Sequence, residues 1–332
     1  MKSQIVQFFL VGIILFFFGS CQQQTSKPSS SGKSGEIVIV IDSTLWNGQA
    51  GTILRDSLMA SFPGLPQYEP SFTIVNIHPS NFKSILQRHR NVLMVEIGPV
   101  QAGKSYSFTF KREVYADPQL VLNLRAVNVS TLDSVLDSMT GTIIQKFTDE
   151  ERARSVASLR KIANTKVTSE LTQLTGIVLP LSDDFFIASR NANYVWVRKE
   201  TVNTSVGLQI FRMPYSSQTD FAPESIVSVR DSISRVHIPG PRKGSFMTTD
   251  KMVPLLLETT QVDSSYAVQL KGLWRTEGDF MGGPFMMYVI HDKLKEELVF
   301  IDAFVYAPKF NKREYMKELD ARIHSLRFVN SR

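Results

Sequence analysis

Strand-like apolar runs dominate the first part of the chain. Four stretches carry them: EIVIVID from Glu36, FTIVNIH from Phe72, NVLMVEIG from Asn91, and the pair SYSFTF and QLVLNLR within residues 105–125. Their continuous, β-branched character predicts buried strands. Helical spacing lies between them, over residues 50–61 and in a shorter stretch that should bury Phe82, Ile85 and Leu86. Strands that alternate with helices predict an N-terminal α/β domain over residues 36–128.

Two amphipathic helices are predicted next, as a helical connector over residues 129–175. The first begins at Ser130 and presents a single apolar face. The second begins at Thr148, where Glu151 three residues on completes a capping-box pattern. We expect it to stop at Gly176, because glycine readily ends a helix.

Short strand-like pieces with close spacing fill the rest of the chain. They are IVLPL, DFFIAS, NYVWVRKE, GLQIFRMPY, SFMTT, PLLLETTQ, SYAVQLKGLWRT, FMMYVIHD and ELVFIDAFVYAP. Helices are predicted over residues 223–236 and from Asn311, where Glu314 is the expected capping partner. Many strands with short turns predict an antiparallel sheet with flanking helices, a C-terminal α+β domain over residues 176–332. The fold class predicted for the whole chain is therefore α+β.

The N-terminus has the pattern of an export signal. Lys2 precedes an apolar run over residues 8–18, too short for a membrane span of about 20 residues. Gly19-Ser20-Cys21 follows, and the whole resembles the signal and lipobox of bacterial lipoproteins, although Phe18 stands where Leu is usual. The resemblance implies a signal peptide over residues 1–20 and acylation of Cys21 as the mature N-terminus.

Residues 21–35 predict a flexible, lipidated tether, because QQQTSKPSSSGKSG after Cys21 offers no large apolar side chain. Several acyl chains on Cys21 would anchor the protein stably to a membrane. In Bacteroidota, lipoproteins exported to the cell surface usually carry acidic residues after the Cys. Gln22, Gln23 and Gln24 are neutral, so if the chain is a lipoprotein of this kind, the missing acidic residues favour the periplasmic side of the outer membrane.

Composition narrows the function further. The chain has 332 residues, 43% of them hydrophobic, which is enough for a substantial core. The formal charge of +6 is spread out, with no dense Lys/Arg cluster on one predicted element. This argues against nucleic-acid binding and supports only a mild attraction to anionic lipid or glycan. Cys21 is the only cysteine and no two of the five histidines have metal-ligand spacing, so we expect no disulfide, metal or cofactor.

The stretch GLWRTEGDFMGGPFMM is the most unusual segment. It places Trp274, Arg275, Glu277 and Asp279 among glycines between two strong strands. These four side chains could face a ligand from a loop. A wide hairpin, with its glycines at special backbone angles and its Trp in the core, explains the same pattern.

Two strands carry further candidates. Strand alternation puts Tyr194, Trp196 and Arg198 on one face of NYVWVRKE, where they could stack a sugar or an aromatic ligand, or form one packed face. Asp302 lies inside the apolar VFIDAFVY. It could be an acid or base with a raised pKa, or a structural carboxylate paired with an arginine such as Arg275.

A resemblance to a known family rests on several of these segments. The lipobox, EIVIVID, YVWVR, GLWRTEGDFMGGPF and IDAFVYAPKFNKREYMKELD together resemble the Bacteroidota lipoprotein family catalogued as domain of unknown function 4837. This family implies no activity and no catalytic residues. The strand-rich C-terminal half is also similar in outline to PsbP-like domains, which is an analogy of fold alone.

Two functions remain open at this point. The first is a non-catalytic binding or envelope-assembly module, membrane-bound through its lipid, with an envelope protein or a glycan as its partner. The alternative is an envelope hydrolase or transferase that uses the carboxylates of Asp302, Glu277 and Asp279.

Overall fold

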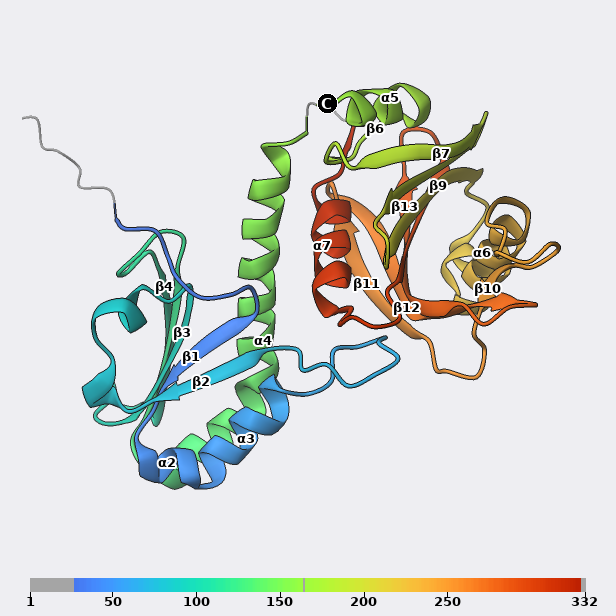
Figure 1. Cartoon of the computed structure of the whole chain (residues 1–332). Helices are drawn as coiled ribbons and strands as arrows, with labels where there is room; N and C mark the ends of the chain where they lie inside the picture. The colour runs from blue at the N-terminus through green and yellow to red at the C-terminus, as the bar shows by residue number, and fades with distance from the viewer. Residues whose placement is uncertain (1–26, 164, 330–332) are drawn as a thin grey trace, which may run out of the picture.

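The computed structural model describes residues 27–163 and 165–329, which form two lobes (Figure 1). We call residues 27–160 the N lobe and residues 165–329 the C lobe. The predicted signal peptide and Cys21 lie outside the described residues. Of the described helices, none combines the length and the apolar character needed to cross a bilayer.

The described part of the N lobe contains a five-stranded sheet in the order β2-β1-β3-β5-β4. All neighbours are parallel except β4, which lies antiparallel to β5 at one edge. The strands are β1 (Glu36–Val40), β2 (Thr73–Ile77), β3 (Asn91–Ile97), β4 (Tyr106–Arg112) and β5 (Leu120–Ala126). Helices α2 (Ser43–Asn47) and α3 (Gln49–Leu58) follow β1, and two short 3-10 turns, η2 (Pro79–Asn81) and η3 (Ser84–Arg88), follow β2.

The long helix α4 (Val129–Arg160) completes the N lobe. Its apolar face shares one core with the sheet through Leu132, Leu136, Ile143 and Phe147. The predicted helix boundary at Thr148 is therefore wrong, because the helix continues through it. The acidic run after Thr148 does not mark a helix start. Its side chains serve ion pairs within the N lobe instead, as between Glu150 and Arg112 and between Glu151 and Arg90.

Helix α4 ends at Arg160, and the next helix belongs to the C lobe. Helix α5 (Lys166–Thr175) begins at Thr165, whose hydroxyl accepts a hydrogen bond from the Thr168 amide. Leu171 of α5 packs in the C-lobe core. The helical connector predicted over residues 129–175 is thus divided between the two lobes.

The described part of the C lobe contains an eight-stranded antiparallel sheet in the order β10-β12-β13-β14-β9-β8-β7, with β11 paired to the other half of β12. Its strands are β7 (Phe185–Asn191), β8 (Tyr194–Glu200), β9 (Ser205–Pro214), β10 (Phe246–Thr249), β11 (Leu256–Val262), β12 (Ser265–Glu277), β13 (Gly282–Asp292) and β14 (Glu297–Tyr306). A separate pair joins β6 (Ile177–Val178) to β15 (Arg327–Phe328).

Helices cover both faces of the curled C-lobe sheet. Helix α6 (Pro223–His237), preceded by the 3-10 turn η4 (Gln218–Phe221), closes one core against the sheet. Helices α5 and α7 (Arg313–His324) close the other. Figure 1 shows α6 and α7 on opposite sides of the strands. The predicted α+β class, with an antiparallel sheet and flanking helices, is confirmed.

Two details of the N lobe differ from the sequence prediction. Ile85 is not buried but 69% exposed, because residues 79–88 form two 3-10 turns separated by Ser84 at a φ of +54°. Phe82 does pack in a small core against the sheet. Part of the predicted tether over residues 21–35 is also not free, because Ser30 and Ser31 are bound to the N lobe.

Backbone hydrogen bonds hold that first segment in place. The Ser30 amide donates to the Asp117 carbonyl at 3.1 Å, and the Ser31 amide donates to the Arg88 carbonyl at 2.9 Å. Gly32, at a φ of +92°, lies directly against the His89 ring, where a Cβ atom would overlap it. Backbone pairing needs no apolar side chain, so the Ser/Gly composition did not reveal it.

Glycines of the GGPF stretch permit close packing around Trp274. The indole Nε1 donates across the sheet to the Val305 carbonyl at 3.2 Å. A Cβ atom on Gly283, which pairs with Trp274, would lie 2.1 Å from that carbonyl oxygen. The backbone of β14 cannot give way easily, so this position requires glycine.

We predict that Gly283→Ala lowers the free energy of unfolding by about 1–3 kcal/mol, because the added methyl group overpacks the sheet. Chemical denaturation followed by circular dichroism measures it. Gly141→Ala is the matched control, since a Cβ atom there meets nothing within 4 Å on the surface of α4. That control should be stabilised by about 1 kcal/mol. Equal effects of the two variants would contradict the role given to Gly283.

Candidate functional site

An aromatic cavity opens at one end of the C-lobe sheet. Its volume is about 500 Å³, and its walls come from the ends of β8, β12 and β14, the turn between β8 and β9, and the loop after α6. The side chains that define it are Trp196, Arg198, Trp274, Thr276, Phe304 and Tyr306. A volume of this order is typical of small-molecule sites. We refer to this space as the aromatic cavity.

Strand alternation delivers two predicted residues to the aromatic cavity. Trp196 and Arg198 both lie on the α6 side of β8, while Val195 and Val197 enter the opposite core. The Arg198 guanidinium lies over the Trp196 ring at 4.5 Å and pairs with the Glu200 carboxylate. Burial lowers the pKa of Arg198.

Two buried hydrogen-bond donors on the β8 side of the aromatic cavity have no acceptor among the described residues. Trp196 is 9% exposed, and its Nε1 is buried without an acceptor among the described residues. Nε of Arg198 is in the same situation. Buried donors are normally paired in proteins, and an unpaired one costs about 1–3 kcal/mol. A ligand oxygen in the aromatic cavity would satisfy them.

Trp274 and Tyr194 have mainly structural surroundings. Trp274 is 3% exposed, packs edge-on against Phe304 and contributes the floor of the aromatic cavity. Tyr194 does not line the cavity. Its ring stacks on His237 at 3.9 Å, and its hydroxyl donates to Oε1 of Gln209 at 3.0 Å, while burial raises its pKa.

The other three candidates from the glycine-rich segment, Arg275, Glu277 and Asp279, lie outside the lining of the aromatic cavity. Arg275 pairs with Glu277 at 2.6 Å, and both side chains are about half exposed. Asp279 accepts a hydrogen bond from the Phe280 amide at 2.6 Å and lies 3.9 Å from Arg242. The structure therefore separates these three side chains from Trp274, which had been grouped with them.

Asp302 is fully buried in the centre of the C lobe. Its Oδ2 atom lies 3.1 Å from Nε of Arg230 and accepts a hydrogen bond from Gln209 at 2.9 Å. The suggested partner Arg275 is thus wrong, since the arginine comes from α6. Burial raises the pKa of Asp302, and the Arg230 charge partly opposes this shift.

Arg230 is the residue that sequence reasoning missed. It occupies the buried face of α6, 1% exposed, with its guanidinium 3.8 Å above the Phe285 ring and one NH group donating to Thr249. An arginine in a predicted amphipathic helix is normally assigned to the solvent-exposed face. A lone carboxylate in an apolar strand was the only signal that such a partner must exist.

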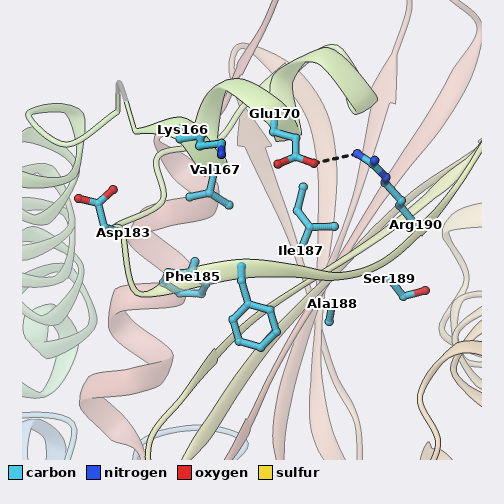
Figure 2. Close-up of a pocket in the computed structure, with 10 residues that line it drawn as sticks. Lys166, Val167, Glu170, Asp183, Phe185, Ile187, Ala188, Ser189 and Arg190 are labelled. Carbon is cyan, nitrogen blue, oxygen red and sulfur yellow. Dashed lines mark hydrogen bonds and ion pairs between the residues drawn. The ribbon is translucent and has the colours of Figure 1, made fainter.

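A second hollow lies on the outside of the edge strand β7 (Figure 2). It is an open groove of about 660 Å³ between β7 and α5. Glu170 of α5 and Arg190 of β7 form an ion pair across it at 2.8 Å. None of the predicted site residues lines this groove. No cluster of three or more His, Cys, Asp or Glu side chains in the described part of the chain is arranged to hold a metal ion.

A protein-family model matches each lobe. The model of a domain of unknown function, DUF4837, matches residues 164–325. The C lobe is a DUF4837 domain. A different domain of unknown function, DUF8532, matches residues 30–160 of the N lobe. The junction of the two matches falls where α4 ends and α5 begins, and neither description supplies an activity.

Other comparisons add little. The comparison with curated proteins gave no match. Among solved structures, the chain is similar to the crystal structure of LpqN, involved in cell envelope biogenesis of Mycobacterium tuberculosis, at 13% identity and a TM-score of 0.27. That match covers 45% of this chain and 81% of LpqN. A likeness this slight carries no argument about function.

We predict that Asp302→Asn lowers the free energy of unfolding by about 3–5 kcal/mol, because it leaves the Arg230 charge buried without its counter-charge. Urea denaturation measures the loss. The double variant Asp302→Leu/Arg230→Met, which removes both charges, should recover most of the stability. An Asp302→Asn protein as stable as the unmodified chain would rule out the buried pair.

Proposed function

We propose that this protein is a non-catalytic, lipid-anchored binding protein of the cell envelope, whose ligand occupies the aromatic cavity of the DUF4837 domain. The observation that carries the proposal is the convergence of Trp196 and Arg198 from β8 with Trp274 from β12 on one cavity. These residues are far apart in sequence, and two of them bring donors that the described residues leave unpaired.

The chemistry of the cavity suggests what the ligand offers. Aromatic side chains supply flat apolar surface, while Thr276 and the Thr201–Ser205 turn supply hydroxyl and backbone groups. An acceptor oxygen beside that surface would pair with the donors on Trp196 and Arg198 that no described residue satisfies. A sugar residue of an envelope glycan has both features, so a glycan is the partner we favour over a protein.

Burial of Asp302 argues against the alternative of a hydrolase or transferase. A general acid must reach its substrate within hydrogen-bond distance. Asp302 is 0% exposed and held by Arg230, and it does not line the aromatic cavity. Glu277 and Asp279, the other two proposed carboxylates, lie outside that cavity as well.

We predict that ligand binding changes the fluorescence of Trp196 and Trp274. Trp46 is the third tryptophan, so a Trp46→Phe background isolates the signal. Titration with glycans released from native envelopes should saturate, and Arg198→Gln should weaken binding about tenfold or more through loss of a charged hydrogen bond. Arg190→Gln, which breaks an exposed ion pair on β7, is the matched control. If both variants bind alike, the aromatic cavity is not the site.

Acylation of Cys21 is a separate prediction. The intact mass of protein from native membranes should equal residues 21–332 plus the acyl groups, and Cys21→Ser should abolish both the added mass and the stable membrane anchoring that depends on acyl chains. Fractionation should place the acylated protein in the outer membrane, protected from labelling of the cell surface. An unmodified N-terminus, or ready labelling on intact cells, would refute the corresponding half of this prediction.

A further inference from the structure

The described chain begins at a basic, partly apolar corner of the N lobe. Three segments meet there: the first residues from Lys27, the turn η3, and the turn between β4 and β5. The Ser31 hydroxyl donates to the Ile85 carbonyl at 3.4 Å, and the Lys27 ammonium donates to the Glu113 carbonyl. Figure 1 shows these first residues, in blue, on the side of the N lobe away from the C lobe. We call this surface the basic corner, made of Lys27, Lys83, Ile85, Arg88, Val114 and Tyr115.

The cations of the basic corner have no ion-pair partners among residues 27–163 and 165–329. Lys27, Lys83 and Arg88 are exposed, and no carboxylate of the described residues lies within 4.0 Å of them. Neighbouring arginines behave differently, since Arg90 pairs with Glu151 and Arg112 with Glu150. These three cations outnumber the two exposed acidic residues of the β4–β5 turn, Glu113 and Asp117, so the corner carries a net positive charge.

Apolar side chains are exposed among those cations. Ile85 is 69% exposed, Val114 37% and Tyr115 36%. The Tyr115 ring packs edge-on against buried Phe82 at 5.9 Å. Lysine and arginine around exposed aliphatic and aromatic groups are the features that bind proteins to the interface of an anionic bilayer.

Chain length restricts how far this corner can be from the membrane. Pro28 is seven residues further along the chain than Cys21, and the chain binds the N lobe from there on. Seven residues span at most about 25 Å when fully extended. An acyl anchor at Cys21 therefore keeps the basic corner within about 25 Å of the bilayer surface.

We propose that the basic corner is a membrane-contact surface that binds anionic phospholipid headgroups and inserts Ile85 into the interface. The proximity argument rests on the lipid anchor of the proposed function, whereas the charge and exposure arguments do not. Contact at this corner holds the N lobe against the bilayer and presents the aromatic cavity of the other lobe to the periplasm.

The test uses the mature chain, residues 21–332 with Cys21→Ser, so that no acyl group contributes. Binding is measured by co-sedimentation with vesicles of phosphatidylcholine alone and of phosphatidylcholine with 30% phosphatidylglycerol. We expect binding only to the anionic vesicles. Each basic residue near such a surface strengthens partitioning onto the bilayer about fivefold. The variant Lys83→Gln/Ile85→Ser/Arg88→Gln loses two such charges and one apolar side chain, so its partition coefficient should fall at least about 30-fold.

The C lobe offers a matched control. Leu294 is 74% exposed between the exposed residues Lys293 and Lys295, so Lys293→Gln/Leu294→Ser/Lys295→Gln makes the same changes in charge and apolar surface elsewhere. This control should retain most of the binding. Hydrogen exchange on vesicles should show protection confined to residues 82–88 and 113–117.

Three results would overturn the proposal: equal loss in the two triple variants, equal binding to neutral and anionic vesicles, or no vesicle binding at all. If the last occurs while cross-linking from Lys83 captures an envelope protein, the corner is a protein interface instead. Because the chain tested carries no lipid, failure of acylation at Cys21 leaves this measurement intact. Failure of glycan binding in the aromatic cavity leaves it intact as well.

Discussion

The buried pair of Arg230 and Asp302 is the constraint on which the C lobe depends. Taking both charges out of water is costly, and the structure offsets the cost with hydrogen bonds from Gln209 and to Thr249 and with the Phe285 ring face. These partners come from β9, β10 and β13, so only one placement of α6 satisfies them. The loop after α6 and the strand β10 are walls of the aromatic cavity, which is therefore fixed by a pair that does not touch it.

A second buried carboxylate joins the lobes. Glu69 of the N lobe is 3% exposed, and its two oxygens accept hydrogen bonds from the Lys312 and Arg313 amides at 2.7 and 2.8 Å. Those amides begin α7, where a negative charge is stabilising. Arg152 of α4 adds an ion pair to Asp320 of α7 at 2.7 Å. The helix that closes the C-lobe core is thus bound to the N lobe at its N-terminus and again at Asp320.

The sequence predicted much of the fold because apolar periodicity is a local property. Strand positions and the two faces of β8 follow from alternation alone. The errors arise where a distant partner decides. The acidic run after Thr148 has the pattern of a helix start, but in the structure its glutamates pair with Arg90 and Arg112 of the N lobe. Glu314 looked like the capping partner of α7, yet Glu69, more than 200 residues earlier, takes that role.

The candidate site was predictable only in part, for the same reason. Trp196 and Arg198 were found because one strand carries both, whereas their meeting with Trp274 depends on how the sheet curls. Arg230 could not be named as the partner of Asp302, because helix and strand are separated by about 70 residues of chain. Ile85 was misplaced because the positive φ of Ser84 breaks the helical period that the apolar spacing suggested.

The distribution of charge also depends on contacts between distant segments, and it distinguishes one side of the N lobe from the rest of the molecule. No single element holds a dense basic cluster, yet Lys27, Lys83 and Arg88 gather where three segments meet. The aromatic cavity belongs to the other lobe, and α4, with 32 residues and a length of about 48 Å, lies between the N-lobe sheet and the C lobe. If the basic corner contacts the bilayer as proposed, the N lobe lies between the bilayer and a ligand held in the aromatic cavity. A cavity at that distance from the bilayer could bind a bulky envelope partner that has no room at the membrane surface itself.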